Sequence, residues 1–207
     1  MTGPAARPGR DAFSERRKCL QRLLVLPGSL LFHEQSSAGG QLEEPLADSV
    51  RTALSAAIAN HAPPVPAFRD RKSHLDYAYW LTTMSARIGN RMVNELARQE
   101  FLQTVWYETT RAGLELSLVL GLIQVESNFR KYAISHAGAR GLMQVMPFWA
   151  RVIGDGDAGK LFHMQTNLRF GCVILRHYID REQGDLFMAL GRYNGSRGKP
   201  PYPNAVF

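Results

Sequence analysis

The stretch "VLGLIQVESNF", residues 119–129, places one carboxylate, Glu126, at the end of an apolar run. At about 100° per residue the apolar side chains cover most of a helix over 115–126, so we expect this helix to be central. Burial and the negative end of the helix dipole both raise the pKa of a carboxyl group there. A group that is protonated near neutral pH can act as a general acid. The alternative is an ordinary helix-ending Glu paired with Arg130 or Lys131.

A second stretch, "SHAGARGLMQVMP" (residues 135–147), combines small residues with a buried-looking amide. Its Gly and Ala residues allow the backbone to approach another helix or a ligand closely. We expect a helix to begin near Leu142, with Gln144 in its first turn among apolar neighbours. An amide in such surroundings needs a hydrogen-bond partner.

Three segments, "VESNF", "AISHAGARGLMQVMP" and "ALGRYNGS", follow one another, with nine residues from Glu126 to Ser135 and nine more to Gln144. In order and spacing this set resembles the three motifs of the lytic transglycosylase domain of the soluble family, over roughly residues 100–200. The resemblance implies an all-α, lysozyme-like fold and cleavage of the glycan strands of bacterial peptidoglycan without a cofactor.

The resemblance also implies a role for each matching residue. Glu126 is the single catalytic acid and base, and Tyr193 contacts its carboxyl group. The substrate-binding residues, which hold the N-acetyl group or ring of a sugar and close the site, are Ser135, Gln144, Met146, Tyr193 and Asn194.

A single acid suits a reaction without water. Hydrolytic glycosidases use two carboxylates, but Glu126 is the one carboxylate that stands in a motif. It would protonate the oxygen between N-acetylmuramate and N-acetylglucosamine. The resulting carboxylate would then take the proton of the C6 hydroxyl, whose intramolecular attack on C1 gives a 1,6-anhydro ring. Two alternatives stay open: a hydrolytic muramidase with Asp155 or Asp157 as second carboxylate, and a non-catalytic peptidoglycan-binding assembly protein.

The chain departs from the family in two places. The third motif usually reads "AYNAG" but here reads "GRYNGS", so Arg192 and Gly195-Ser196 are expected to reshape the rim of the cleft. The chain also ends at "YPNAVF", where the family commonly continues with a further helix. We therefore expect a short natural variant or a truncated product, with part of the cleft uncovered.

Helical periodicity accounts for nearly all of the sequence that must position these residues. No convincing alternating strand run occurs, although a short hairpin near 131–140 stays open. The domain is therefore predicted to be all-α, with helices over 45–59, 74–88, 91–112, 115–127, 141–153, 165–182 and 185–193. An Asp48/Ser49 cap begins the first of these, and the prolines of "NHAPPVPA" (60–67) predict an extended linker.

The first residues read as an export signal. A basic start, the ten-residue apolar run "LLVLPGSLLF" (23–32) and the small residues of "SSAGG" predict a signal peptide over 1–38 and a periplasmic location. The pair Arg16-Arg17 resembles a twin-arginine signal but lacks its usual neighbours, so the general route also stays open. We expect residues 39–67 to form a helix and linker, and 68–207 the catalytic domain.

The composition and charge of the chain indicate which classes of partner it can bind. Hydrophobic residues make up 45% of the chain and charged residues 21%, as in a globular protein, and the net charge of +7 suits an anionic partner. Basic and aromatic residues do not alternate along any element, so no nucleic-acid partner is expected. The apolar run at 23–32 is too short to span a bilayer, so no stable membrane insertion is expected.

The sequence contains no clear metal-binding motif. The six His residues form no pair spaced four apart, and "DGDAGK" (155–160) has Thr166 where a calcium loop needs a glutamate. A capped turn is the better interpretation of that segment. Cys172, among aliphatic neighbours, is predicted to be a buried, inert thiol.

Overall fold

The structure is a computed structural model that describes residues 40–59 and 66–207. Over these ranges the chain is helical, with two isolated bridges, Ile134 with Arg140 and Arg140 with Val145, and no β-strand. The all-α prediction is confirmed. The bridges lie in the region where a short hairpin was left open. The predicted signal peptide and most of the predicted proline-rich linker lie outside the described residues.

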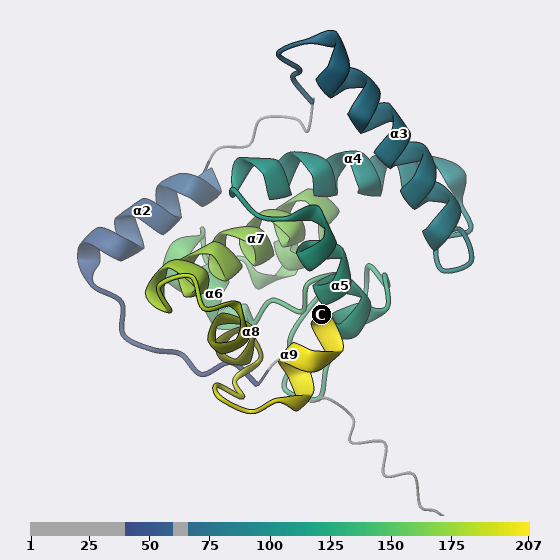
Figure 1. The fold of residues 1–207 in the computed structure, drawn as a ribbon. Helices are drawn as coiled ribbons and strands as arrows, with labels where there is room; N and C mark the ends of the chain where they lie inside the picture. Colours follow the sequence, from purple (N-terminus) through teal and green to yellow (C-terminus); the bar gives the residue numbers. More distant parts are fainter. Residues whose placement is uncertain (1–39, 60–65) are drawn as a thin grey trace, which may run out of the picture. The chain divides into compact units, whose positions relative to one another are not determined.

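Most of the described helices follow one another through short loops, but a longer loop, residues 128–146, separates α5 from α6 (Figure 1). In chain order they are α2 (Asp48–Ala59), α3 (Arg71–Ile88), α4 (Glu95–Arg111), α5 (Leu116–Ser127), α6 (Pro147–Ile153), the 3₁₀ helix η2 (Ala158–Phe162), α7 (Met164–Arg181), α8 (Leu186–Asn194) and α9 (Pro201–Val206). Six of the predicted helices correspond to α2, α3, α4, α5, α7 and α8, with ends that differ by a few residues.

Local capping explains several of these boundaries. The side chain of Asp70 accepts a hydrogen bond from the backbone N–H of Ser73 before α3, and Asp185 accepts from that of Met188 before α8. Asn94 plays the same part before α4. A side-chain oxygen at this position satisfies a backbone donor that the first helical turn leaves unpaired. The starts of these helices therefore follow from the local sequence.

The core forms around α5 and α7. The first of these packs against α4 and α9, and the second against α4 and α8. Val119, Leu122 and Ile123 of α5 are completely buried. The central position predicted for the helix over 115–126 is therefore confirmed, and it explains why the sequence there is apolar on most sides.

A buried ion pair joins α4 to α7. The Arg169 guanidinium lies 2.7 Å from a carboxylate oxygen of Glu108, and both side chains are almost entirely buried. Arg111 approaches the same carboxylate at 3.3 Å from the more exposed side. A buried charge without its partner is costly, so the carboxylate of α4 and the guanidinium of α7 must stay together in the folded state.

The predicted helix over 141–153 is wrong in its first half. Helix α6 begins only at Pro147, and Gln144 lies in a turn with φ of 47°. The reason is tertiary, because the side chain of Asn167 in α7 holds this backbone: its amide donates to the carbonyl oxygens of Arg140 and Leu161, and its oxygen accepts from Met143 N–H. A Cβ on Gly141, where φ is 77°, would lie 2.4 Å from that amide. The loop therefore needs glycine and cannot continue as helix.

Residues 40–59 pack against the rest of the described domain. Helix α2 lies on α6 and α7, and the indole N–H of Trp149 donates to the side-chain oxygen of Gln41 at 2.8 Å. The predicted boundary between 39–67 and 68–207 stays a prediction. No described helix is both long enough and apolar enough to cross a membrane.

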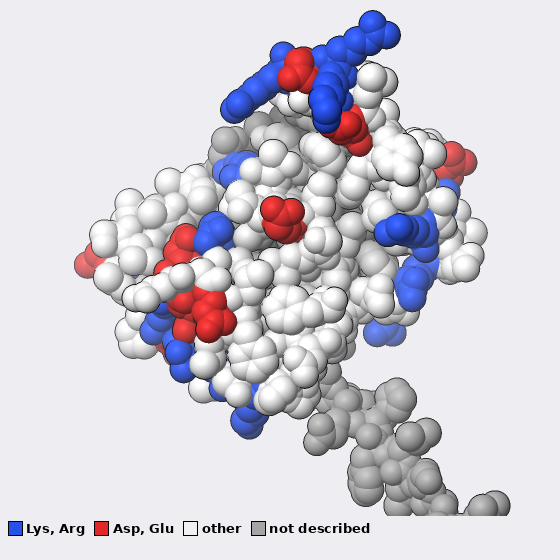
Figure 2. Space-filling model, in the orientation of Figure 1, with Lys and Arg blue, Asp and Glu red and all other residues white. Residues whose placement is uncertain are grey.

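Charge is unevenly spread over the face seen in Figure 2. Lys and Arg gather over the start of α3, and acidic and basic side chains mix toward the ends of α7 and α8. The surface over α9 is uncharged in this view. On this face the positive net charge therefore forms scattered groups, several of them beside acids.

Candidate active site

Glu126 lies in the last turn of α5 and points into the domain. Its side chain is only 6% exposed. The helix ends directly after it, because Asn128 adopts a left-handed conformation with φ of 48° and its N–H bonds to the carbonyl oxygen of Gln124. Ser127, which lies between Glu126 and Asn128, is buried as well, and its hydroxyl donates to the carbonyl oxygen of Ile123. The end of α5 is thus fixed from within the core.

The Glu126 carboxyl group has one hydrogen-bond partner among the described residues. The Tyr202 hydroxyl donates to Oε1 at 2.5 Å, whereas Oε2 is buried and has no partner in that part of the chain. Burial raises the pKa of Glu126 to about 8, although the hydrogen bond from Tyr202 acts in the lowering direction. The raised pKa inferred from the apolar sequence is confirmed. The alternative of an ordinary helix-ending Glu paired with Arg130 or Lys131 is wrong, since Glu126 is buried and its partner in the described residues is Tyr202, while Arg130 donates to the carbonyl oxygen of Ser127.

Tyr202 belongs to α9, a helix that is absent from the helices predicted from the sequence. This helix of six residues begins with Pro201, whose fixed φ suits a first helical position. It packs against α5 and α8. Gly121 permits the approach to α5, because a Cβ at this position would lie 2.6 Å from the carbonyl oxygen of Val206. The prolines around Tyr202 signal a turn, and only the folded domain reveals its position beside Glu126.

The predicted contact between Tyr193 and the Glu126 carboxyl group stays a prediction, and in the described residues no hydrogen bond joins the two side chains. The Tyr193 hydroxyl donates instead to the carbonyl oxygen of Met143 at 2.8 Å, from a fully buried position. Burial, with Glu126 nearby, raises the pKa of Tyr193 well above its usual range. Tyr193 therefore links the third motif to the second, whereas the hydrogen bond to the Glu126 carboxyl group comes from Tyr202.

Ser135 and Gln144 lie in one doubly bridged loop. The Ser135 hydroxyl accepts from the N–H of Ala139, and the Gln144 amide donates to the carbonyl oxygens of Ala133 and Gly141 at 3.1 and 2.9 Å. The partner that a buried amide needs is thus the backbone of the loop itself. In the described residues no hydrogen bond joins either side chain to the carboxyl group of Glu126.

Met146 and Asn194 stand at helix ends. Met146 is half-buried and directly precedes α6. Asn194 ends α8, where its amide donates to the Ser196 hydroxyl at 3.0 Å. Its side-chain oxygen is buried and has no partner among the described residues. An unpartnered buried oxygen is costly, so this amide is a candidate for contact with a ligand.

The two other carboxylates considered as catalytic groups cap a turn. Asp157 accepts from the N–H of Gly159 at the start of η2, and Asp155 accepts from Lys160 and from the N–H of Asp157. The hydrogen bond from Lys160 lowers the pKa of Asp155. Both side chains are exposed, as the interpretation of a capped turn requires. Neither has the buried surroundings of Glu126.

Cysteine chemistry and metal binding were also considered for the described residues. Cys172 is buried, and burial raises the pKa of its thiol, which agrees with the predicted inert role. Within residues 40–59 and 66–207 no three His, Cys, Asp or Glu side chains gather as a metal site would require.

Comparison with known proteins gives one family. Residues 104–200 match the family model described as the transglycosylase SLT domain. The curated relatives include membrane-bound lytic murein transglycosylase C from Histophilus somni (strain 2336), 48% identical over 115 residues in an alignment that covers 48% of this chain and 32% of the relative. The protein of the same name from Actinobacillus pleuropneumoniae serotype 5b (strain L20) is 38% identical over 89 residues in an alignment that covers 39% of this chain and 24% of the relative.

The chain spans less than a third of the length of these relatives. The matched segment runs from α4 to the loop before α9, and so contains Glu126 and all the predicted substrate-binding residues. The helical, lysozyme-like fold that the motifs implied is the fold of this segment. Residues 104–200 therefore match the transglycosylase SLT domain, and the relatives with which this part of the chain aligns are named lytic murein transglycosylases.

Proposed function

We propose that this protein is a peptidoglycan lytic transglycosylase. It would cleave the β-1,4 bond between N-acetylmuramate and N-acetylglucosamine and leave 1,6-anhydro-N-acetylmuramate ends. The observation that carries the proposal is the Glu126 carboxyl group, which is buried, has a pKa of about 8 and is bound by Tyr202 through one oxygen only. The family model and the names of the relatives support the same reaction class.

In the first step Glu126 acts as an acid. At neutral pH its buried carboxyl group is protonated, which is the form that can donate a proton to the glycosidic oxygen. The C1–O4 bond then breaks, the N-acetylglucosamine O4 leaves as a hydroxyl group, and positive charge develops at C1. The oxygen Oε2, free of any partner in the described residues, is the one we assign to the substrate.

In the second step the same group acts as a base. Glu126, now a carboxylate, receives the hydrogen bond from Tyr202 and takes the proton of the C6 hydroxyl. The oxygen of that hydroxyl bonds to C1 of its own ring and closes the anhydro bridge. Because the attacking hydroxyl is tethered, no second carboxylate is needed to activate water. The proton returns Glu126 to its starting state.

Residues of the second and third motifs would hold the sugars. We assign Ser135, Gln144, Met146 and Asn194 to substrate binding, and Tyr193 to the support of the Met143 backbone. The unpartnered side-chain oxygen of Asn194 supports its assignment. We further propose that the chain is exported and acts on glycan strands in the periplasm, as the signal-like residues 1–38 suggest.

The masses of the products test this proposal. Purified sacculi are digested with the protein, and the released muropeptides are separated and weighed. A transglycosylase gives anhydro ends that are lighter by one water than the reducing ends left by a muramidase. Reducing ends alone would support the hydrolytic alternative, and unchanged sacculi that still bind the protein would support a non-catalytic role.

A further inference from the structure

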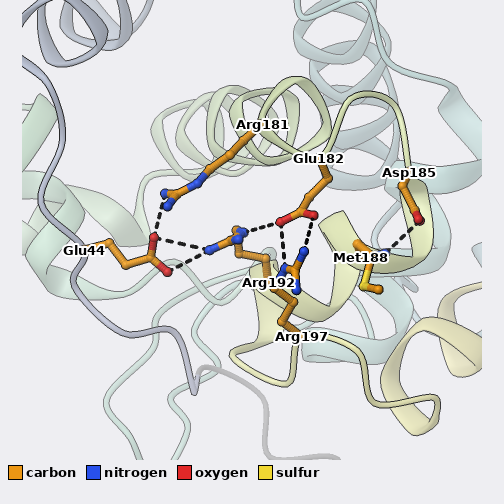
Figure 3. Close-up of polar contacts among 7 residues, drawn as sticks. All are labelled: Glu44, Arg181, Glu182, Asp185, Met188, Arg192 and Arg197. Atoms are coloured by element: carbon orange, nitrogen blue, oxygen red, sulfur yellow. Dashed lines mark hydrogen bonds and ion pairs between the residues drawn. The ribbon is translucent and has the colours of Figure 1, made fainter.

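Five charged side chains form a continuous chain of ion pairs at one side of the domain (Figure 3). The Glu44 carboxylate lies 2.6 Å from Arg181 and 2.9 Å from Arg192. The Nε of Arg192 donates to Glu182 at 2.7 Å. Glu182 also accepts two hydrogen bonds from Arg197, at 2.9 and 2.8 Å. Two acids thus bridge three arginines in sequence.

These five residues come from four segments of the chain. Glu44 belongs to residues 40–47, which we call the N-terminal strap. Arg181 and Glu182 end α7, Arg192 lies in α8, and Arg197 lies in residues 195–200, the α8–α9 loop. The strap precedes the part of the chain that matches the family model. The ion-pair chain therefore fastens a segment outside that match to the third motif.

Backbone contacts bring the same segments together. A Cβ on Gly195 would lie 2.0 Å from the carbonyl oxygen of Gly40, so the strap lies directly on the end of α8. A Cβ on Gly191 would lie 2.9 Å from the Cα of Arg197, so the α8–α9 loop folds back on α8. Neither position has room for a side chain. The strap, α8 and the loop form one packed unit.

The network is more ordered than an isolated surface pair. The side chains of Glu182 and Arg192 are only 7% and 17% exposed, and the paired hydrogen bonds from Arg197 help to lower the pKa of Glu182 to about 2. An isolated, exposed ion pair contributes little to the stability of a protein. A partly buried arginine that forms two hydrogen bonds to a carboxylate holds both side chains in a defined geometry. Arg192, the departure from the family pattern noted in the sequence, is the residue that links the two acids.

The α8–α9 loop leads directly into α9, which carries Tyr202 to Glu126. We infer that Glu44 is a positioning residue: through Arg192, Glu182 and Arg197 it holds the α8–α9 loop so that Tyr202 stays on Glu126. On this inference the N-terminal strap helps to position the residues of the active site. Its effect on turnover rests on the proposed function, whereas its effect on the contact between Tyr202 and Glu126 does not.

The test follows the titration of Glu126 by carbon NMR in the full chain with labelled glutamate side chains. Tyr202 of α9 and Tyr193 of α8 are the titratable side chains of other helices that interact with this carboxyl group in the described structure. Four proteins are compared: the parent, Glu44→Ala, Tyr202→Phe, and the double variant. Glu43→Ala is the matched control, because Glu43 is the neighbouring acid and pairs with Arg151 on α6 instead.

If Glu44 acts through Tyr202, Glu44→Ala raises the pKa of Glu126 by roughly half a unit or more, the size expected for loss of part of one hydrogen bond. Tyr202→Phe gives a larger rise, the double variant gives no more than Tyr202→Phe alone, and Glu43→Ala gives none. Glu44→Gln repeats the measurement if the alanine variant does not fold. The inference fails if Glu44→Ala leaves the pKa unchanged, matches Glu43→Ala, or adds a further rise in the Tyr202→Phe background.

Turnover of sacculi separates this inference from the proposed function. A parent protein that releases no muropeptides contradicts the proposed function and leaves the titration to decide the role of Glu44. An active parent with Glu44→Ala equal to Glu43→Ala in both titration and kcat contradicts the role of Glu44 alone.

Discussion

The Tyr202 hydroxyl donates a hydrogen bond to Oε1 of Glu126 at 2.5 Å, across the contact between α9 and α5. The pair is almost fully buried, and the second carboxylate oxygen has no partner in the described residues. Burial favours the neutral acid, and Tyr202 stabilises the carboxylate that forms after proton donation. One residue can therefore serve as acid and then as base, provided that α9 holds Tyr202 in place.

The pH dependence of activity follows from this pair. Because the first step needs protonated Glu126, kcat/KM on soluble glycan fragments should fall above about pH 8. The hydrogen bond from Tyr202 lowers the pKa of Glu126, so Tyr202→Phe should move this upper limb to higher pH while reducing kcat. Tyr193→Phe is the control, because the Tyr193 hydroxyl bonds to the carbonyl oxygen of Met143. The upper limb of the pH profile of this variant should stay at the pH of the parent. A Tyr202→Phe limb that moves to lower pH would contradict the assignment.

Removal of the acid should separate binding from catalysis. Glu126→Gln keeps the size of the side chain and an acceptor for Tyr202 but cannot donate the catalytic proton. We expect sacculus binding in a pull-down assay to remain, with a loss of roughly a hundredfold or more in the rate of muropeptide release. Asp155→Asn, at the exposed turn before η2, should keep the parent rate. Equal activity of Glu126→Gln and the parent would refute the role of this residue.

The same substitution should stabilise the protein at alkaline pH. Glu126 titrates near pH 8 when folded and near 4.5 when unfolded, so between these values the folded state alone keeps the proton. Stability therefore falls as pH rises through this window. Glu126→Gln lacks the effect, and its advantage in free energy of unfolding should grow from pH 4.5 to 8, up to roughly several kcal/mol. Urea unfolding at a series of pH values measures it, and a constant difference would contradict the buried acid.

Gly121 offers a test of the contact between α5 and α9. Gly→Ala inside a helix normally stabilises by about 1 kcal/mol. Here the added Cβ would lie 2.6 Å from the carbonyl oxygen of Val206, so the sign should reverse, with a loss of about 1–3 kcal/mol. Because α9 must move, activity should fall as well. Ser117→Ala, on the exposed side of the same helix, is the matched control and should be neutral or slightly stabilising. Unfolding and turnover are measured on both variants.

Much of the fold could be predicted because its signals are local. Apolar residues recur at helical spacing along each predicted helix, and the structure adds side-chain caps from Asp70, Asn94 and Asp185 at the starts of α3, α4 and α8. The burial of Glu126 followed from the same apolar periodicity. The helix predicted from Leu142 did not form, because Asn167 is twenty or more residues away and binds the loop backbone from α7. Periodicity alone carries no information about such a partner.

The hydrogen bond that Glu126 accepts from Tyr202 could not be predicted for a similar reason. Tyr193 stands in a motif and Tyr202 does not, yet the hydrogen bond comes from Tyr202. The approach of α9 depends on the absence of a side chain at Gly121, which has meaning only once two distant segments pack together. The ion pairs of Arg192 with Glu44 and Glu182 likewise join residues whose proximity the linear sequence does not reveal.

The most direct test of the proposed chemistry is digestion of sacculi in heavy-oxygen water, followed by mass spectrometry of the new sugar ends. Ring closure by the C6 hydroxyl uses no solvent oxygen. The proposed mechanism therefore predicts anhydro-N-acetylmuramate ends that carry no label, formed by the parent protein and not by Glu126→Gln. Reducing ends that carry one heavy oxygen each would contradict it, because they would show that water, activated by another group, attacks C1.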